Sequence, residues 1–267
     1  MPAAAAAMRL RLLSYNIQTG ISTRAYHEYL TKGWRHVLPS ARRQANLDRI
    51  AQVVAAYDVV GLQEVDGGSL RSGYINQVEY LALRAGFPWW HSQINRNLGR
   101  LAQHANGLLS RLRPTEIREH RLPGRIPGRG ALFVRYGDDP PLVLLILHLA
   151  LGARARRAQL AYVAELAGRY PHVVLMGDMN CRASPLDETD AFAGTGLQEP
   201  PGLGPTFPSW APRRCIDRLL VSPSLRVHRL EVLPCTCSDH LPVAAEIDLP
   251  PDLAASVAAC RVDLAAT

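Results

Sequence analysis

Residues 172–180 read HVVLMGDMN. The apolar run from Val173 to Met176 predicts a strand that is buried on both faces. Asp178 and Asn180 follow a glycine at alternate positions, so both side chains point to the same side just beyond the strand. A carboxylate and a carboxamide there can hold a water, a hard cation or a phosphate oxygen. Gly, Asp and Asn also form ordinary Asx turns, so this stretch alone does not indicate a functional site. A functional site is favoured because other predicted strands also end in polar residues.

The composition is that of a globular protein, and the length allows one large domain or two small ones. The chain has 267 residues, of which 48% are hydrophobic and 20% charged. The longest apolar run, 142–151, is interrupted by His148 and is too short to span a bilayer. The start of the chain has no basic region before its alanines, which argues against a cleaved signal peptide. We therefore expect a cytoplasmic protein without a transmembrane segment.

Cysteine and charge content narrow the class further. Five cysteines, an odd number, suit a reducing compartment better than a disulfide framework. Cys235-x-Cys237 has no second Cys/His pair at zinc spacing, which favours free thiols. The net charge is +7, and Lys32 is the only lysine. An arginine-rich surface suits an anionic substrate such as a phosphate ester, although a GC-rich coding bias explains it equally well.

Hydrophobic periodicity predicts alternating strands and helices. Strands are expected at 10–15, 58–64, 89–91, 105–110, 131–136, 142–149, 173–176, 216–222, 226–233 and 241–247, and helices at 41–57, 74–85 and 153–170. No linker or short repeat interrupts this pattern. We therefore predict one mixed α/β domain over residues 9–249, with a flexible N-terminus over 1–8 and a peripheral tail over 250–267.

Polar groups stand at the ends of six predicted segments: Asn16, Glu64, His148, Asp178 with Asn180, Asp217, and Asp239 with His240. Sheets of α/β proteins keep their sites at such strand ends. Carboxylates and carboxamides without cysteine are oxygen ligands, which suit Mg²⁺ or Mn²⁺ rather than zinc. A histidine beside a carboxylate can transfer protons. Glu64 after a buried strand is hard to explain as structural, because an unpaired buried carboxylate is costly.

These residues lie in segments that resemble the endonuclease/exonuclease/phosphatase superfamily. In chain order the segments are Ser14-Tyr15-Asn16, Leu62-Gln63-Glu64-Val65, His148-Leu149, Gly177-Asp178-Met179-Asn180, Ile216-Asp217-Arg218 and Ser238-Asp239-His240-Leu241-Pro242. The resemblance runs from about Arg9 to Ile247. It implies a four-layer DNase I-like sandwich, in which two packed mixed β-sheets are flanked by helices, and metal-dependent cleavage of phosphate esters.

The resemblance also implies a role for each strand-end group. Asn16, Glu64 and Asp239 would lie at the metal, Mg²⁺ or in its place Mn²⁺, with Glu64 as the principal ligand. Asp217 would orient His240, which would bind the scissile phosphate or act as acid and base.

The remaining groups would act on the water and the phosphoryl oxygens. Asp178 would orient or deprotonate the attacking water, and Asn180 would steady that water and a phosphoryl oxygen. His148 would donate to a non-bridging oxygen. Whether Asp178 or His240 is the base stays open.

Four further residues are candidates for substrate binding. Asn106 lies in a segment that resembles one near the phosphate in the family, although Asn-Gly is first a turn signal. Arg125 and Arg129 either clamp substrate anions or are solvated loop arginines. Arg182 follows Asn180-Cys181, and this segment partly resembles a motif of inositol polyphosphate 5-phosphatases.

The sequence indicates the superfamily more clearly than it indicates the branch within the superfamily. Apurinic-site endonucleases usually carry lysine after the glutamate, whereas Val65-Asp66 follows Glu64 here. The chain looks most like unassigned bacterial members, with sphingomyelinases and tyrosyl-DNA phosphodiesterases as relatives. We predict an Mg²⁺-dependent phosphodiesterase that uses in-line attack by water. The alternatives are a phosphomonoesterase acting on an inositol or lipid phosphate headgroup and an inactive binding module.

The expected partner is a phosphate-ester substrate, either a nucleic acid or a phospholipid or inositol headgroup. No obligate protein partner is evident from the sequence.

Overall fold

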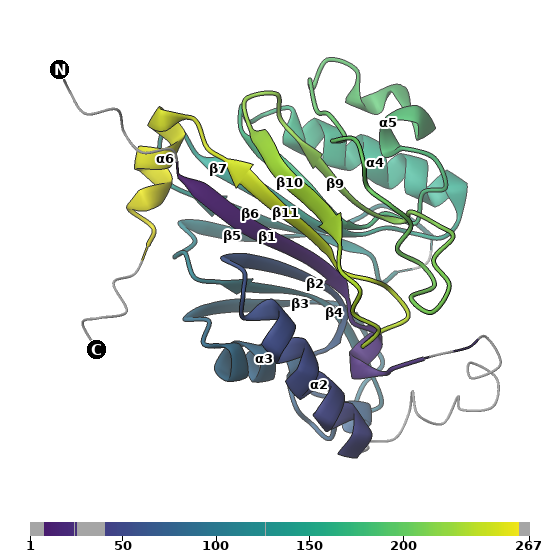
Figure 1. The fold of residues 1–267 in the computed structure, drawn as a ribbon. Helices are drawn as coiled ribbons and strands as arrows, with labels where there is room; N and C mark the ends of the chain where they lie inside the picture. Colours follow the sequence, from purple (N-terminus) through teal and green to yellow (C-terminus); the bar gives the residue numbers. More distant parts are fainter. Residues whose placement is uncertain (1–7, 24, 26–40, 126, 262–267) are drawn as a thin grey trace.

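The computed structural model describes residues 8–23, 25, 41–125 and 127–261, and it contains two β-sheets packed face to face (Figure 1). The six-stranded sheet has the order β10-β11-β1-β2-β4-β3, and the five-stranded sheet has the order β5-β6-β7-β8-β9. The strands of the first sheet are β1 (Arg9–Asn16), β2 (Val59–Asp66), β3 (Trp89–Asn97), β4 (Gln103–Ser110), β10 (Arg226–Val232) and β11 (Val243–Asp248). Those of the second are β5 (Glu116–Arg121), β6 (Gly130–Tyr136), β7 (Leu142–His148), β8 (Val173–Asp178) and β9 (Asp217–Val221).

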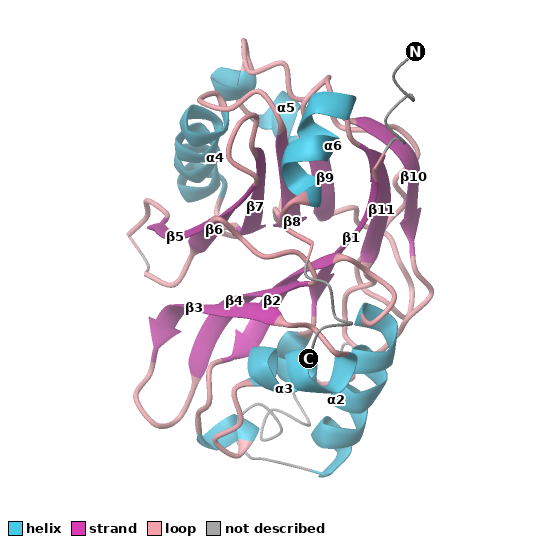
Figure 2. Cartoon of the chain, turned by 90° about the vertical axis from the view of Figure 1, so that its left-hand side faces the viewer, coloured by secondary structure: helices cyan, strands magenta, loops and turns pink. Residues whose placement is uncertain are grey.

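Helices cover the outer faces of the two sheets (Figure 2). The α-helices are α2 (Ala41–Val54), α3 (Gln77–Ala85), α4 (Ala153–Ala167), α5 (Pro185–Glu188) and α6 (Pro251–Ala258), and the short 3-10 helices are η1 (Gln18–Gly20), η3 (Leu70–Ser72) and η4 (Asp190–Phe192). α2 and α3 pack on the six-stranded sheet, and α4 packs on the five-stranded sheet. The predicted four-layer sandwich is therefore confirmed.

Alternate side chains of each strand enter different cores, as the two-residue period of a strand requires. Leu12 of β1 packs between the sheets, whereas Leu13 packs against α2 and α3. In β7, Leu144 faces the space between the sheets and Leu145 faces α4. The continuous apolar sequence of the central strands thus reflects burial on both faces.

A glycine allows the two sheets to approach closely. A Cβ added to Gly61 in β2 would lie 3.0 Å from side-chain atoms of Ile146 and Met176 in the facing sheet. Close packing of an interior leaves no room for even one extra methyl group at such a contact. β2 can therefore lie directly over β7 and β8, the strands whose ends carry candidate site residues.

Two segments differ from the sequence-based expectations. β5 was not predicted, because its sequence EIREHR is charged and lacks apolar alternation, as is common for edge strands. The segment after Pro250 was expected to be peripheral, yet Leu253 and Val257 of α6 are fully buried in the core between the sheets. Met8 also packs against this core, while residues 1–7 and 262–267 lie outside the described part. No helix in the described residues is long and apolar enough to cross a membrane.

Candidate active site

Strand direction brings the predicted polar groups to one edge of the sandwich. β1 and β2 are parallel, as are β7 and β8, so each pair ends on the same side of its sheet. β9 runs antiparallel to β8, which places the start of β9 there as well, with Asp217 paired in register with Asp178. β11 runs antiparallel to β1, so the residues just before it, including His240, reach the end of β1.

A bulge in β2 sets the direction of Glu64. The register between β2 and β4 shifts between Leu62 and Val65, and Glu64 has a φ of 55°, in the left-handed region. An extra residue and a strained backbone at a strand end are characteristic of functional sites. The Glu64 side chain is 36% exposed to solvent, whereas that of Asp178 is 3% exposed. Glu64 is thus the site carboxylate that stays accessible.

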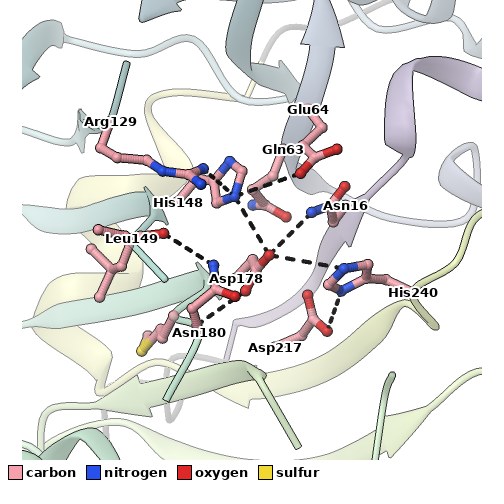
Figure 3. A network of polar contacts seen from close by, with 12 residues as sticks. Asn16, Gln63, Glu64, Arg129, His148, Leu149, Asp178, Asn180, Asp217 and His240 are labelled. Atoms are coloured by element: carbon pink, nitrogen blue, oxygen red, sulfur yellow. Dashed lines mark hydrogen bonds and ion pairs between the residues drawn. The ribbon is translucent and has the colours of Figure 1, made fainter. Parts of the chain in front are cut away.

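Asp178 lies at the centre of the site (Figure 3). Its Oδ2 accepts a hydrogen bond from Nδ2 of Asn16 at 3.1 Å and lies 3.5 Å from Nε2 of His148 and 3.9 Å from Nε2 of His240. Its Oδ1 accepts from the backbone N–H of Asn180 at 3.1 Å. The backbone at Gly177 admits no side chain, because it has a φ of 148° and an added Cβ would lie 2.0 Å from the Leu147 carbonyl oxygen. Glycine is therefore required just before Asp178.

His240 is held between two carboxylates. Its Nδ1 lies 2.8 Å from Oδ2 of Asp217, so this nitrogen carries the proton and Nε2 faces Asp178. Asp217 also accepts a hydrogen bond from the Thr206 hydroxyl at 2.6 Å, and the Phe207 ring packs 4.9 Å from the His240 ring. The predicted Asp–His pair is present in the structure, and Thr206 and Phe207 fix its orientation.

On the opposite side of Asp178, His148 contacts Arg129 and approaches Glu64. The guanidinium Nη1 of Arg129 lies against Nε2 of His148, and Glu64 Oε1 lies 3.7 Å from the same nitrogen. Because a guanidinium only donates, Nε2 of His148 is the acceptor in this arrangement. The sequence suggested His148 and Arg129 separately, but only the fold shows that they touch.

Burial and neighbouring charges shift the pKa values of these groups in different directions. Burial, reinforced by Asp217 and Glu64, raises the pKa of Asp178 to about 7. Burial opposes the charged form of His240, but the Asp217 carboxylate outweighs it and raises the pKa to about 10. Burial and the Arg129 charge hold the pKa of His148 well below its usual range. At neutral pH His240 is therefore the charged imidazole and His148 the neutral one.

The oxygen-rich side of the site fits a divalent cation. The partial burial of Glu64 and the nearby Asp239 carboxylate raise the pKa of Glu64, so two negative groups lie close together at this point. A hard cation bound by these oxygens would offset their repulsion. Asp178, Asp217 and His240 also have ligand atoms within 4.8 Å of one another and could hold a metal. In that trio, however, Asp217 already binds His240 and Thr206, so the Glu64 side is the more open position.

The four candidate substrate-binding residues lie in different environments. Arg129 is at the site. Asn106 is fully buried between the sheets, where Nδ2 donates to the carbonyl oxygen of Gly130 at 3.0 Å, and it thereby supports the strand next to Arg129. Arg125 and Arg182 are exposed. Within the described residues, no hydrogen bond or ion pair joins either arginine to the group around Asp178.

Three residues of the site were not among the predicted set. Gln63 is fully buried beside Glu64, and its Oε1 has no partner within the described residues. It lies within a predicted motif, which is the signal that could have found it. Thr206 and Phe207 lie in the irregular segment that precedes β9. Their contacts with the Asp–His pair depend on a loop whose path the sequence does not indicate.

Comparison with known proteins agrees with this geometry. The model of the endonuclease/exonuclease/phosphatase family matches residues 13–240, an interval that includes every strand-end group of the site. The chain belongs to this family. Members of the family hydrolyse phosphoric esters, and the chain is a hydrolase of this class. The search of curated protein sequences returned no match.

Solved structures of family members share the fold of this chain. An endonuclease/exonuclease/phosphatase from Beutenbergia cavernae matches with a TM-score of 0.71 and 23% identity, covering 90% of this chain and 72% of that one. The mannosyl-6-phosphatase of Bacteroides thetaiotaomicron matches with a TM-score of 0.65 and 19% identity over 89% and 99% of the two chains. D. rerio TDP2 complexed with single-strand DNA product matches with a TM-score of 0.66 and 18% identity over 90% and 98%. At these identities the likeness establishes the fold.

Proposed function

We propose that this family hydrolase is an Mg²⁺-dependent phosphodiesterase, in which one domain over residues 9–249, with α6 packed against it, cleaves its substrate by in-line attack of water. The observation that carries the proposal is the position of His240, charged and fixed by Asp217, directly across from the buried Asp178 carboxylate. A cationic imidazole and a carboxylate with a pKa near neutrality are suited to a phosphoryl group and to an attacking water, respectively.

Asn16, Glu64 and Asp239 would hold the cation. When bound, Mg²⁺ would supply Lewis-acid stabilisation of the charge on the phosphoryl oxygens. The Glu64 carboxylate is partly accessible, and its partial burial together with the neighbouring Asp239 carboxylate raises its pKa, which supports a cation at this point. We expect Mn²⁺ to substitute, because it also prefers oxygen ligands.

The other side chains of the site would bind and orient the reactants. Asp178 accepts a proton from the attacking water, and Asn180 steadies that water from the adjacent turn. His240 donates to the phosphoryl group. The Arg129 guanidinium now contacts His148, and a phosphoryl oxygen is a stronger acceptor for it than a neutral imidazole. Arg129 therefore turns to the substrate when it binds, which frees Nε2 of His148. In the other neutral tautomer Nε2 carries the proton and donates to a phosphoryl oxygen.

Hydrolysis of two chromogenic esters tests the proposal directly. Bis-p-nitrophenyl phosphate and p-nitrophenyl phosphate are each incubated with Mg²⁺, Mn²⁺ or EDTA, and plasmid DNA is treated in parallel. We expect EDTA-sensitive cleavage of the diester that is lost in Glu64→Gln but retained in Glu79→Gln, an exposed position on α3. Turnover of the monoester alone would replace the proposal with a phosphatase, and diester cleavage that resists EDTA would exclude the metal.

A further inference from the structure

Basic side chains continue away from the Asp178 centre along the β3–β4 hairpin. Arg96 of β3 is paired in register with His104 of β4, so their side chains point to the same face of the sheet. His104 is two residues from Asn106, which faces the second sheet and binds the Gly130 carbonyl. Arg96 and His104 are therefore on the side of the hairpin that faces Arg129.

The loop that carries Arg129 lies directly on Arg96. A Cβ added to Gly128 would be 3.1 Å from the Cβ of Arg96 and 3.2 Å from its Cδ. The absence of a side chain at Gly128, where φ is 117°, lets the loop come this close. In Figure 2, β3 and β4 lie on the same side of the molecule as the connection between β5 and β6. Arg129 thus stands between the catalytic centre and Arg96.

Positive charge gathers around His104, and the nearby carboxylate is that of Asp66, which is paired in register with His104. Burial, together with the charges of Arg71, Arg96 and Arg129, lowers the pKa of His104 to about 4. Arg71 is neutralised by its ion pair with buried Asp66. Within the described residues, neither Arg96 nor Arg129 forms an ion pair with an acidic side chain. The Arg96 guanidinium therefore remains available to an anion, whereas that of Arg129 contacts His148.

We propose that Arg96 and His104 form a subsite for a second phosphate of the substrate, next to the scissile phosphodiester that Arg129 and His240 contact. The inference rests on the proposed function and narrows its substrate class. A guanidinium and an imidazole N–H at one face supply charge-assisted donors that match phosphate oxygens. An adjacent phosphate occurs in a nucleic-acid strand and in a small bisphosphate, and both present the same chemistry to this subsite.

The test compares two esters that differ by one phosphate. Thymidine 5′-(p-nitrophenyl phosphate) is hydrolysed with a free 3′-hydroxyl or with a 3′-phosphate, so the reacting bond and the leaving group are the same. We expect the 3′-phosphate to raise kcat/KM about tenfold or more, as a charged hydrogen bond to phosphate would. In Arg96→Gln the ratio of the two kcat/KM values should fall to near one.

The matched control is Arg226→Gln. Arg226 is exposed on β10, the edge strand of the same sheet opposite to β3. This variant loses the same unit of net charge, so it should keep the wild-type ratio. A wild-type ratio near one, or a ratio that Arg96→Gln leaves unchanged, would refute the subsite.

A binding measurement separates this inference from the proposed function. If the wild-type protein turns over neither ester, phosphodiesterase activity fails, and calorimetry then decides the subsite. Thymidine 3′,5′-bisphosphate should bind more tightly than thymidine 5′-phosphate in the wild type but not in Arg96→Gln, and equal binding in the wild type would overturn the subsite. A single-stranded oligonucleotide with a neutral methylphosphonate next to the scissile bond tests whether a nucleic-acid strand supplies the second phosphate. Cleavage slower than that of the all-phosphate oligonucleotide indicates a strand. Cleavage at the same rate indicates a small bisphosphate.

Discussion

The Asp178 carboxylate accepts hydrogen bonds from the Asn16 side chain and the Asn180 backbone, and it faces His148 and His240 at longer distances. Of the two Asp178 oxygens, Oδ2 is the one that lies near Nε2 of both imidazoles. Burial raises its pKa to about 7, which matches a carboxylate that takes a proton near neutral pH.

We expect Asp178→Asn to lower kcat at least about a hundredfold, since an amide cannot accept the proton of the attacking water. The measurement is steady-state hydrolysis of the diester at saturating Mg²⁺. Asp187→Asn, at an exposed position of α5, is the control and should retain full activity. A value for Asp178→Asn within a few-fold of the wild type would remove this residue from the mechanism.

At the scale of elements, the end of β2 is anchored by a buried polar network. Asp66 accepts hydrogen bonds from the Ser69 backbone at 2.7 Å, the Ser69 hydroxyl at 2.7 Å and the Ser72 hydroxyl at 2.9 Å, and it pairs with Arg71. The network lies two residues from the Glu64 bulge and holds η3 against β4. It therefore stabilises the strand end on which Glu64 depends.

Asp66→Ala should lower the free energy of unfolding by about 3–5 kcal/mol, because it leaves the buried Arg71 guanidinium without its carboxylate partner. Chemical denaturation measures the change. The double variant Asp66→Ala/Arg71→Met should recover part of the loss, since it no longer buries an unpaired charge. A double variant that is as unstable as the sum of the single changes would contradict the ion-pair explanation.

His104 in β4 should make stability depend on pH. Its pKa in the folded protein is about 4, mainly because of burial and Arg71, whereas an unfolded histidine has a pKa of about 6.5. The unfolded chain therefore binds the proton more readily, and stability is lost as the pH falls from about 6.5 to about 4. Compared with His104→Gln, the wild type should lose ~1 kcal/mol more over this range, after allowance for partial solvent screening. Thermal denaturation across the range tests this, and identical pH profiles of the two proteins would contradict it.

At the scale of the whole molecule, the site exists only where the two sheets meet. Asn16, Glu64 and His240 come from the six-stranded sheet or its connections, whereas His148, Asp178 and Asp217 belong to the five-stranded sheet. A cation bound by Glu64 and Asp239 would offset the repulsion between these two carboxylates, and it would do so only in the folded state. Metal binding should therefore stabilise the assembled sandwich.

Adding Mg²⁺ at about a hundred times its Kd should raise the free energy of unfolding by about 2.7 kcal/mol. Differential scanning calorimetry with Mg²⁺ or EDTA measures the shift in Tm. Glu64→Gln should abolish the shift, and Glu79→Gln should preserve it. A shift that persists in Glu64→Gln would place the cation elsewhere, with the Asp178, Asp217 and His240 group as the next candidate.

The order of strands and helices and the strand-end groups follow from local patterns in the chain, whereas the four layers were implied by the resemblance to the family. Apolar runs mark strands buried on both faces, and a polar residue at the end of such a run has few structural explanations. The sequence therefore sufficed to predict the class of fold and the residues that gather around Asp178. It did not predict β5, whose charged residues lack the usual alternation, or the packing of α6 into the core.

Tertiary structure alone decided how these groups relate to one another. The contact of Arg129 with His148, the support of Asp217 by Thr206, and the approach of Gly128 to Arg96 join segments that are separate in the chain. The bulge that turns Glu64 outward is likewise set by the pairing of β2 with β4. Such contacts depend on the angle and distance between packed elements, which arise from the complementarity of whole surfaces and leave no periodic signal in the sequence.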